Sequence, residues 1–177
     1  MENIKKLQLP LSDEDIKNLH CGDRVLLSGE IFTARDAAHK RMTETLKSGG
    51  TLPFEIKGKT VYYAGPAPAK PGQAIGSCGP TTSGRMDAYS PYLLRLGLKV
   101  MIGKGERSSE VISAMKECNG IYFGATGGAG ALISKSIKKG EVFAYEDLGA
   151  EAVRLLTVED FPVTVVMDSE GKSLSEG

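Results

Sequence analysis

Two short segments of this 177-residue chain place arginine beside hydroxyl and glycine residues in patterns suited to anion binding. The first is Thr33-Ala-Arg35-Asp36, and the second is Gly79-Pro-Thr81-Thr82-Ser83-Gly84-Arg85. Unpaired N–H groups at a helix start attract an oxyanion, and a guanidinium can bind a carboxylate through two parallel hydrogen bonds. With one arginine in each segment, the pair predicts a ligand that carries two carboxylates.

Each segment also has a purely structural interpretation, which the spacing leaves open. Residues 33–36 then form only a capping box, with Arg35 in solvent. Residues 79–85 form only a glycine–proline turn whose hydroxyl groups cap the next helix. The second segment is not a Walker A loop, because no Gly-Lys-Ser or Gly-Lys-Thr follows its glycines.

Lys104 and His39 are additional candidates. Lys104 stands in a glycine turn directly after an expected strand, and ligands of α/β proteins often bind beyond the carboxyl ends of strands. A solvated lysine is the alternative. His39 follows Asp36 by three residues and shares its face of the expected helix. A structural role and a ligand contact are equally compatible with that position.

The charge balance limits the classes of partner. The chain has 22 basic and 22 acidic side chains, which argues against a general nucleic-acid or membrane-surface role. Residues 1–107 carry a net charge of +5 and residues 108–177 a net charge of −5. The positive excess therefore lies in the half that contains both arginine segments, which favours an anionic small ligand. The sequence has no apolar run long enough to span a membrane and no apolar leader, so we expect a cytoplasmic protein.

The cysteines do not form a recognisable metal or redox motif. Cys21, Cys78 and Cys118 are odd in number and far apart, and no pair has Cys-x-x-Cys spacing. We therefore expect free buried thiols, and neither a zinc site nor a redox pair.

The elements that must position these residues follow from apolar periodicity and from turns at glycine and proline. Strands are expected at residues 24–32, 54–57, 60–64, 98–102, 121–124, 142–145, 153–156 and 163–167, the second and third as a hairpin around Gly58. Helices are expected at residues 12–19, 33–46, 86–96 with a bend at Pro91, 108–116, and after the glycines of 127–130 through Ile137. This alternation predicts an α/β fold with a mixed sheet, as a single domain over residues 1–177.

Three strings of residues, taken in order, go beyond these patterns. Thr33-Ala-Arg-Asp-Ala-Ala-His39, Gly79-Pro-Thr-Thr-Ser-Gly-Arg-Met-Asp87 and Gly103-Lys-Gly105 resemble the beta subunit of class I iron–sulfur fumarases. The beta subunit of L-tartrate dehydratase is similar too. The resemblance covers about residues 10–165 and implies a swivelling β/β/α fold. It also implies a hydro-lyase that interconverts fumarate and L-malate, with a tartrate dehydratase and a non-catalytic dianion-binding module as alternatives.

The same resemblance implies how the work is divided between two chains. The family's [4Fe–4S] cluster is held by three cysteines of a partner alpha subunit, so this chain is expected to bind no cofactor itself. Arg35 and Arg85 would bind the substrate carboxylates, Lys104 would add charge, and Thr81 would be the proposed base. Substrate-binding roles would also fall to Thr82, His39 and Asp36, the last by orienting Arg35.

Overall fold

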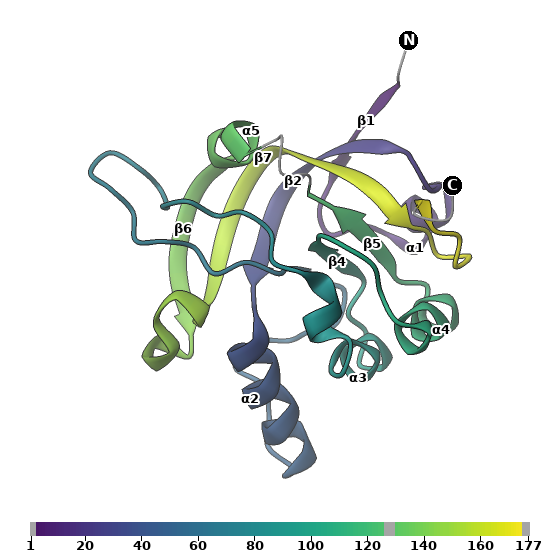
Figure 1. Cartoon of the computed structure of the whole chain (residues 1–177), viewed down its shortest axis with the longest axis horizontal. Coiled ribbons are helices and arrows are strands. Elements are labelled where there is room, and N and C mark those ends of the chain that lie inside the picture. The colour runs from purple at the N-terminus through teal and green to yellow at the C-terminus, as the bar shows by residue number, and fades with distance from the viewer. Residues whose placement is uncertain (1–2, 126–129, 175–177) are drawn as a thin grey trace.

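The computed structural model of the chain describes residues 3–125 and 130–174. Its described strands form one seven-stranded sheet in the order β1-β2-β3-β4-β5-β7-β6, and β2 also pairs with β7 (Figure 1). The strands are β1 (Ile4–Gln8), β2 (Arg24–Thr33), β3 (Thr60–Tyr62), β4 (Val100–Gly103), β5 (Ile121–Gly124), β6 (Ile137–Ala144) and β7 (Val153–Met167).

The sheet is mixed, as expected, and part of it closes on itself. The neighbours from β1 to β5 are parallel, whereas β7 runs antiparallel to β2, β5 and β6. Because β7 pairs with both β2 and β5, the strands β2, β3, β4, β5 and β7 form a closed ring. The carboxyl ends of the parallel strands β2 to β5 therefore lie around the same rim.

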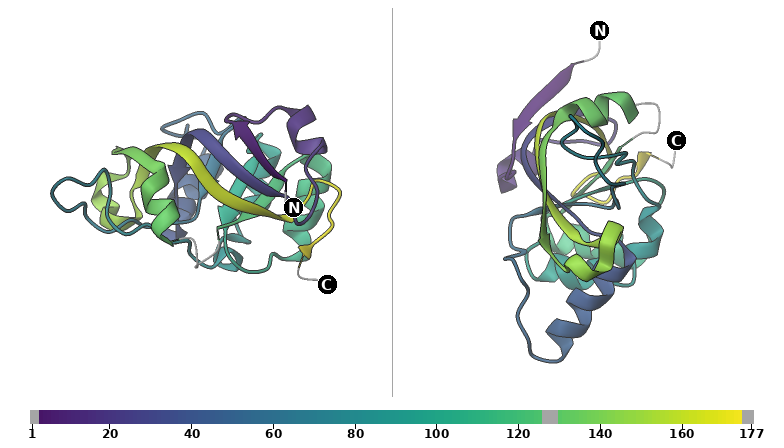
Figure 2. Two further views of the ribbon diagram at one scale, coloured as in Figure 1. Left: turned by 90° about the horizontal axis from the view of Figure 1, so that it is seen from above. Right: turned by 90° about the vertical axis from the view of Figure 1, so that its left-hand side faces the viewer.

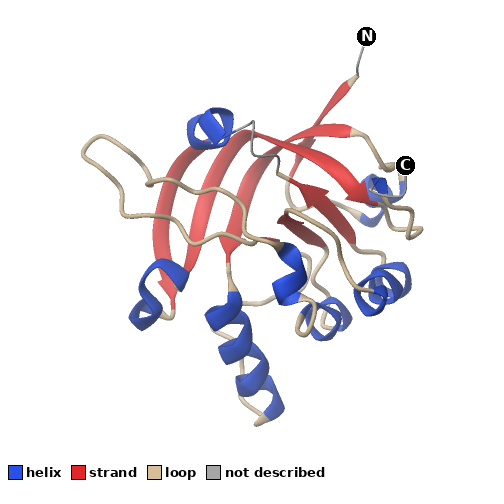
Figure 3. Ribbon diagram, viewed as in Figure 1, coloured by secondary structure: helices blue, strands red, loops and turns tan. Residues whose placement is uncertain are grey.

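Helices surround this ring (Figure 3). Their bounds are α1 (Asp13–Lys17), α2 (Asp36–Lys47), α3 (Ser90–Arg95), α4 (Ser109–Cys118), α5 (Gly130–Ser136) and the 3₁₀ turns η1 (Ser83–Met86) and η3 (Glu146–Glu151). The helices α2, α3 and α4 pack on the outer face of the ring. In Figure 1, they lie below the sheet, and α5 lies at the upper end of β6 and β7. The loop between β3 and η1 extends past β6 in Figure 1 and in the left panel of Figure 2.

Two apolar clusters divide the strand side chains by face. Val100 and Ile102 of β4 belong to the cluster inside the ring, whereas Met101 belongs to the cluster under α2, α3 and α4. Likewise Ile121 and Phe123 point inward, and Tyr122 points to the helices. Burial on both faces explains why these strands read as unbroken apolar runs rather than as an alternation.

The capping residues predicted from the sequence are correct at two helices and wrong at a third. Ser12 forms the expected capping box with Asp15 at α1, and Ser108 caps α4. The capping box at Thr33 is wrong. Thr33 is the last residue of β2, and its Oγ1 accepts a hydrogen bond from the Arg154 N–H of β7, so the hydroxyl serves the sheet.

Three other expected elements differ in the structure. No hairpin forms around Gly58, because β3 pairs in parallel with β2 and β4 instead. Of the helix expected over 86–96, only α3 forms, with the turn η1 just before it. Pro91 lies in the first turn of α3, where a missing N–H costs nothing. The C-terminal strands are longer than expected: β6 begins at Ile137, and β7 is one strand.

The first strand and the glycine segment before α5 are the last parts of the fold. The sequence analysis missed β1, a short edge strand with half-buried side chains on one face only. Of the three glycines in 127–130, the first two lie outside the described residues, and Gly130 begins α5. Within the described part of the chain, no helix has the length and apolar character needed to cross a membrane.

Candidate functional site

The predicted site residues come together at the rim of the ring. Arg35 and Asp36 follow β2, and Lys104 follows β4. The Thr81 segment is fixed between these strands: the Thr81 N–H donates to the carbonyl of Tyr63 just after β3 at 2.7 Å, and Thr82 forms a parallel bridge with Lys104. Three segments far apart in the sequence thus meet at the carboxyl ends of parallel strands, the usual location of ligand sites in α/β folds.

An ion pair joins the two arginine segments directly. Arg85 Nε donates to Asp36 Oδ2 at 3.0 Å. The sequence analysis expected Asp36 to orient Arg35, but among the described residues its ion-pair partner is Arg85. The other carboxylate oxygen, Oδ1, is buried and has no hydrogen-bond partner there. More than half of the Arg85 side chain is exposed, so its remaining N–H groups can reach a ligand.

Arg35 has a different environment from Arg85. Its side chain packs against Gly65, where an added Cβ would lie 2.9 Å from both Cδ and Nη1 of Arg35. Only glycine leaves this space. The Arg35 Nε is buried and has no hydrogen-bond partner in the described part of the chain. An unsatisfied buried donor is costly, and a carboxylate ligand would satisfy it.

The first turn of α2 already contacts an anion from the chain itself. Glu151, at the end of η3, accepts a hydrogen bond from the Ala37 N–H at 3.0 Å. No local pattern indicates this contact, since the two residues are 114 positions apart. The helix N-terminus that was expected to bind a ligand carboxylate is therefore partly satisfied by Glu151, and ligand binding here depends more on the Arg35 side chain.

His39 lies beneath the site rather than on its surface. Its imidazole is fully buried, packs against Tyr63 and Tyr89, and has Nδ1 2.9 Å from the Arg35 carbonyl oxygen. Burial lowers the pKa of His39 to about 4, so the ring is neutral near pH 7. Because a carbonyl only accepts, Nδ1 carries the proton. His39 fixes the backbone of Arg35, and its role as a ligand contact stays a prediction.

The sequence analysis did not single out a buried arginine behind the rim. The Arg107 side chain has no exposed surface, and its Nε donates to Asp87 Oδ1 at 2.7 Å. Asp87 is the last residue of the string Gly79–Asp87, and this position was the available sequence signal for its contact with Arg107. Arg107 itself follows Lys104 by three residues in a turn that reads as solvent-exposed.

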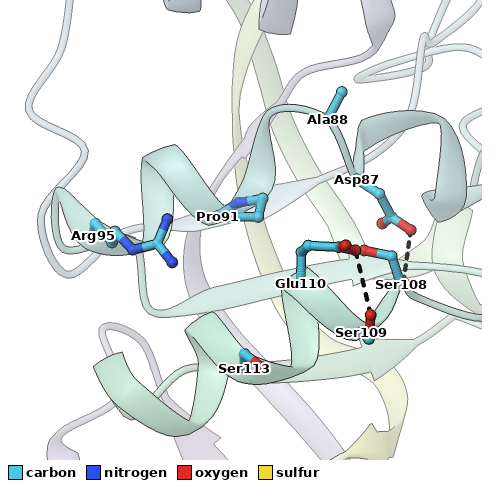
Figure 4. A pocket seen from close by; sticks show the side chains of 8 residues that line it. All are labelled: Asp87, Ala88, Pro91, Arg95, Ser108, Ser109, Glu110 and Ser113. Carbon is cyan, nitrogen blue, oxygen red and sulfur yellow. Dashed lines mark hydrogen bonds between the residues drawn. The ribbon is translucent and has the colours of Figure 1, made fainter.

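A hollow of about 700 Å³ lies between α3 and α4, but it does not coincide with the rim (Figure 4). Its Asp87 carboxylate is already satisfied by Arg107 and by the Ser108 N–H. It contains none of the predicted site residues. Its lining consists of Asp87, Ala88, Pro91, Arg95, Ser108, Ser109, Glu110 and Ser113.

Comparison with known families identifies the family of the chain. The sequence profile described as "Fumarase C-terminus" matches residues 2–177. The chain belongs to the fumarase C-terminal family. Residues 10–165, over which the resemblance was expected, fall within this match.

Similar proteins show two kinds of chain organisation. Fumarate hydratase 2 of Leishmania major is 43% identical over 155 residues, which cover 86% of this chain but 27% of that protein. The aerobic class I fumarate hydratase of Escherichia coli K12 is 43% identical over 150 residues, 84% of this chain and 27% of its own length. A putative L(+)-tartrate dehydratase subunit beta of Methanocaldococcus jannaschii is 38% identical over 172 residues, 94% of this chain and 88% of that one. This fumarase C-terminal chain thus spans just over a quarter of the two fumarate hydratases.

The cysteines of this fumarase C-terminal chain are free thiols, of which Cys78 is buried and Cys21 and Cys118 are only partly buried. Burial raises the pKa of the Cys78 thiol to about 12. Burial, and then the charge of Glu117, also raise the pKa of Cys118. Over residues 3–125 and 130–174, no three His, Cys, Asp or Glu side chains are grouped so that they could hold a metal ion. The assignment of a cluster to a partner stays a prediction.

The buried imidazole makes stability depend on pH in a defined direction. Because the folded-state pKa of about 4 is below the ordinary 6.5, only the unfolded chain binds a proton between these values. Stability should therefore fall as the pH drops from 7 to 4.5, by about 2 to 3 kcal/mol from His39 alone. Urea unfolding at both pH values measures this. His39→Gln should lose less stability over the interval, and His20→Gln, at an exposed position, is the matched control. The same loss in His39→Gln as in the wild type would contradict the assignment.

Proposed function

We propose that this chain is the substrate-binding beta part of a class I fumarate hydratase, a hydro-lyase that interconverts fumarate and L-malate. The observation that carries the proposal is the convergence at one rim of Arg35, Arg85 and Lys104 with Thr81. The Arg85–Asp36 ion pair and the bridge between Thr82 and Lys104 are the contacts that join these segments. Similarity to class I fumarate hydratases supports the choice of reaction.

The chemistry assigned to each residue follows from its environment. Arg35, with an unsatisfied buried Nε, binds one carboxylate of the substrate, and Arg85, half exposed beside Asp36, binds the other. Lys104 is exposed next to the Thr82 backbone and adds positive charge. These cations favour an alkoxide at Thr81, which is what a hydroxyl needs to act as the base that takes a proton from carbon. Thr82 and His39 support this arrangement.

We further propose that a partner alpha subunit completes the site and holds the [4Fe–4S] cluster, in a swivelling arrangement within the cytoplasm. This division is supported by the length of the relatives. The chain accounts for just over a quarter of two fumarate hydratases but aligns with 88% of a tartrate dehydratase beta subunit. The name of that relative, a putative beta subunit, supports an enzyme with more than one chain.

A second candidate is an L-tartrate dehydratase beta subunit, because the similar chain that matches in length has that putative role. Fumarate and tartrate present the same two carboxylates, so Arg35 and Arg85 suit both. The two candidates differ in the hydroxyl groups that the site must bind. A purely regulatory dianion-binding module is the third candidate.

Reconstitution separates these candidates. The purified chain alone should be colourless and inactive. Anaerobic mixing with a cluster-bearing alpha subunit should produce hydration of fumarate, which is measured as the loss of fumarate absorbance. Faster turnover of tartrate would instead support the second candidate. Dicarboxylate binding without turnover of either compound in a cluster-loaded complex would support a regulatory module. Turnover by the chain alone would contradict the division of the site between two chains.

Replacement of Arg85 tests whether a planar guanidinium is needed at the rim. Arg85→Lys keeps the charge but loses the two-pronged contact with a carboxylate, so kcat/KM of the assembled enzyme should fall by about tenfold or more, the equivalent of one charge-assisted hydrogen bond. Arg95→Lys is the matched control, since Arg95 is equally exposed and its ion pair with Glu117 is long, at 3.8 Å. Equal activity of both variants would mean that Arg85 acts only through its charge.

Comparison of two neighbouring threonines tests the proposed base. Thr82 makes no capping hydrogen bond to η1 through its side chain, so Thr82→Ala controls for changes in the loop. Thr81→Ala should lower kcat by at least about 100-fold, the lower range of general acid–base catalysis, with little change in substrate affinity. The measurements are turnover and solvent exchange of the malate C3 proton in each assembled variant. Normal exchange in Thr81→Ala would move the base to the partner, and equal losses in both variants would indicate a damaged loop.

A further inference from the structure

A buried polar network connects the rim to the helices behind it. Its centre is Arg107, whose guanidinium donates to Asp87 Oδ1 at 2.7 Å, to Ser90 Oγ at 2.7 Å and to the Tyr63 hydroxyl at 3.2 Å. The same guanidinium lies over the rings of Tyr63 and Tyr122, 5.2 and 4.9 Å from their centroids. A buried charge with a carboxylate and two hydroxyl partners fixes its neighbours in one geometry.

Tyr122 carries this network to the rim. Its hydroxyl lies 2.7 Å from Ser83 Oγ and 2.8 Å from the Gly105 carbonyl oxygen. Because the carbonyl can only accept, Tyr122 donates to Gly105 and accepts from Ser83. Burial raises the pKa of Tyr122 to about 12, so this hydroxyl keeps its proton. One side chain of β5 thus connects the segment of Thr81 with the turn that carries Lys104.

The two connected segments also contact each other through the backbone. The Ser83 N–H donates to the Lys104 carbonyl at 2.8 Å, and the Lys104 N–H lies 3.4 Å from the Thr81 carbonyl. Gly103 makes this approach possible. A Cβ there would collide with Ser83 Oγ and would lie 2.8 Å from Tyr63 Cδ2. The separation of Thr81 and Lys104 is therefore set by buried contacts on their inner side.

We propose that Tyr122, held against Arg107, is a positioning residue that sets the placement of Thr81 relative to Lys104. Its effect on turnover rests on the proposed function, whereas its effect on the rim geometry does not. Arg35 is the N-cap of α2 and has no hydrogen bond to this network among the described residues. Arg85 lies in η1 with Ser83, but its ion pair with Asp36 also holds it. Loss of the Tyr122 hydroxyl should therefore alter the geometry of the proposed base more than it alters carboxylate binding.

Amide hydrogen exchange of the purified chain tests the geometric part. Tyr122→Phe keeps the ring over Arg107 and removes only the two hydroxyl contacts. Exchange of the Ser83 and Lys104 amides should accelerate about tenfold, as expected when one or two buried hydrogen bonds no longer oppose local opening. Amides of β2 should exchange as in the wild type.

The matched control is Tyr62→Phe, which removes another buried tyrosine hydroxyl, the donor to the Cys78 carbonyl at 2.7 Å. This control should leave Ser83 and Lys104 unchanged. Unchanged exchange at both amides in Tyr122→Phe, or equal acceleration throughout β2, would overturn the proposal. If Tyr122→Phe does not fold, Ser83→Ala removes the same link from its other end and should accelerate exchange at Ser83.

Kinetics of the assembled enzyme test the functional part. In Tyr122→Phe, kcat should fall on the order of 10- to 100-fold, the cost of a small misplacement of reacting groups, while KM changes less than about threefold. An unchanged kcat in an active complex would show that the network is structural only. An inactive wild-type complex would instead contradict the proposed function, and the exchange result would still decide whether Tyr122 positions the rim.

Discussion

The antiparallel pairing of β7 with β2 on one edge and β5 on the other is the constraint on which the rest of the structure depends. A sheet of four parallel strands twists, and the strands at its two edges then point in different directions. Closure by β7 returns β5 to the vicinity of β2. The segments that follow β2 and β4 therefore face a common rim, and Arg35, Arg85 and Lys104 can act on one small ligand although they are up to 69 positions apart in the printed sequence.

Three arginines near this rim show how burial and partners divide one residue type among different tasks. Arg107 is fully buried and fully paired, so its charge is used within the protein. Arg85 is half exposed, and its Nε donates a hydrogen bond to Asp36. Arg35 keeps a buried donor without a protein partner. The capacity to bind an anion increases in that order, because a ligand gains most from donors that the protein leaves unsatisfied.

The parts of this structure that depend on near neighbours could be predicted from the sequence, and the parts that depend on distant ones could not. The caps of α1 and α4 involve residues three apart, and β5 is an unbroken apolar run. The hairpin around Gly58 was wrong because β3 finds its partners in β2 and β4. The contact of Glu151 with Ala37 and the burial of Arg107 left no local pattern. The segments at the rim could be singled out because they combine charge with hydroxyl groups, as at Arg35, or with glycine, as at Arg85 and Lys104, whatever the element around them.

The geometry of the rim also indicates what the proposed partner surface would contribute. Arg85 and Lys104 are largely exposed, and the attraction between two charges about 4 Å apart is worth only about 1 kcal/mol in water. The same charges act far more strongly once water is excluded. The inner side of the rim is already rigid, through Tyr122 and Arg107, so it gains little from further packing. What it lacks is a cover on the outer side. A partner surface that closes over Arg35, Arg85 and Lys104 would lower the local dielectric, and it would turn three weakly acting cations into a site that can stabilise a developing dianion.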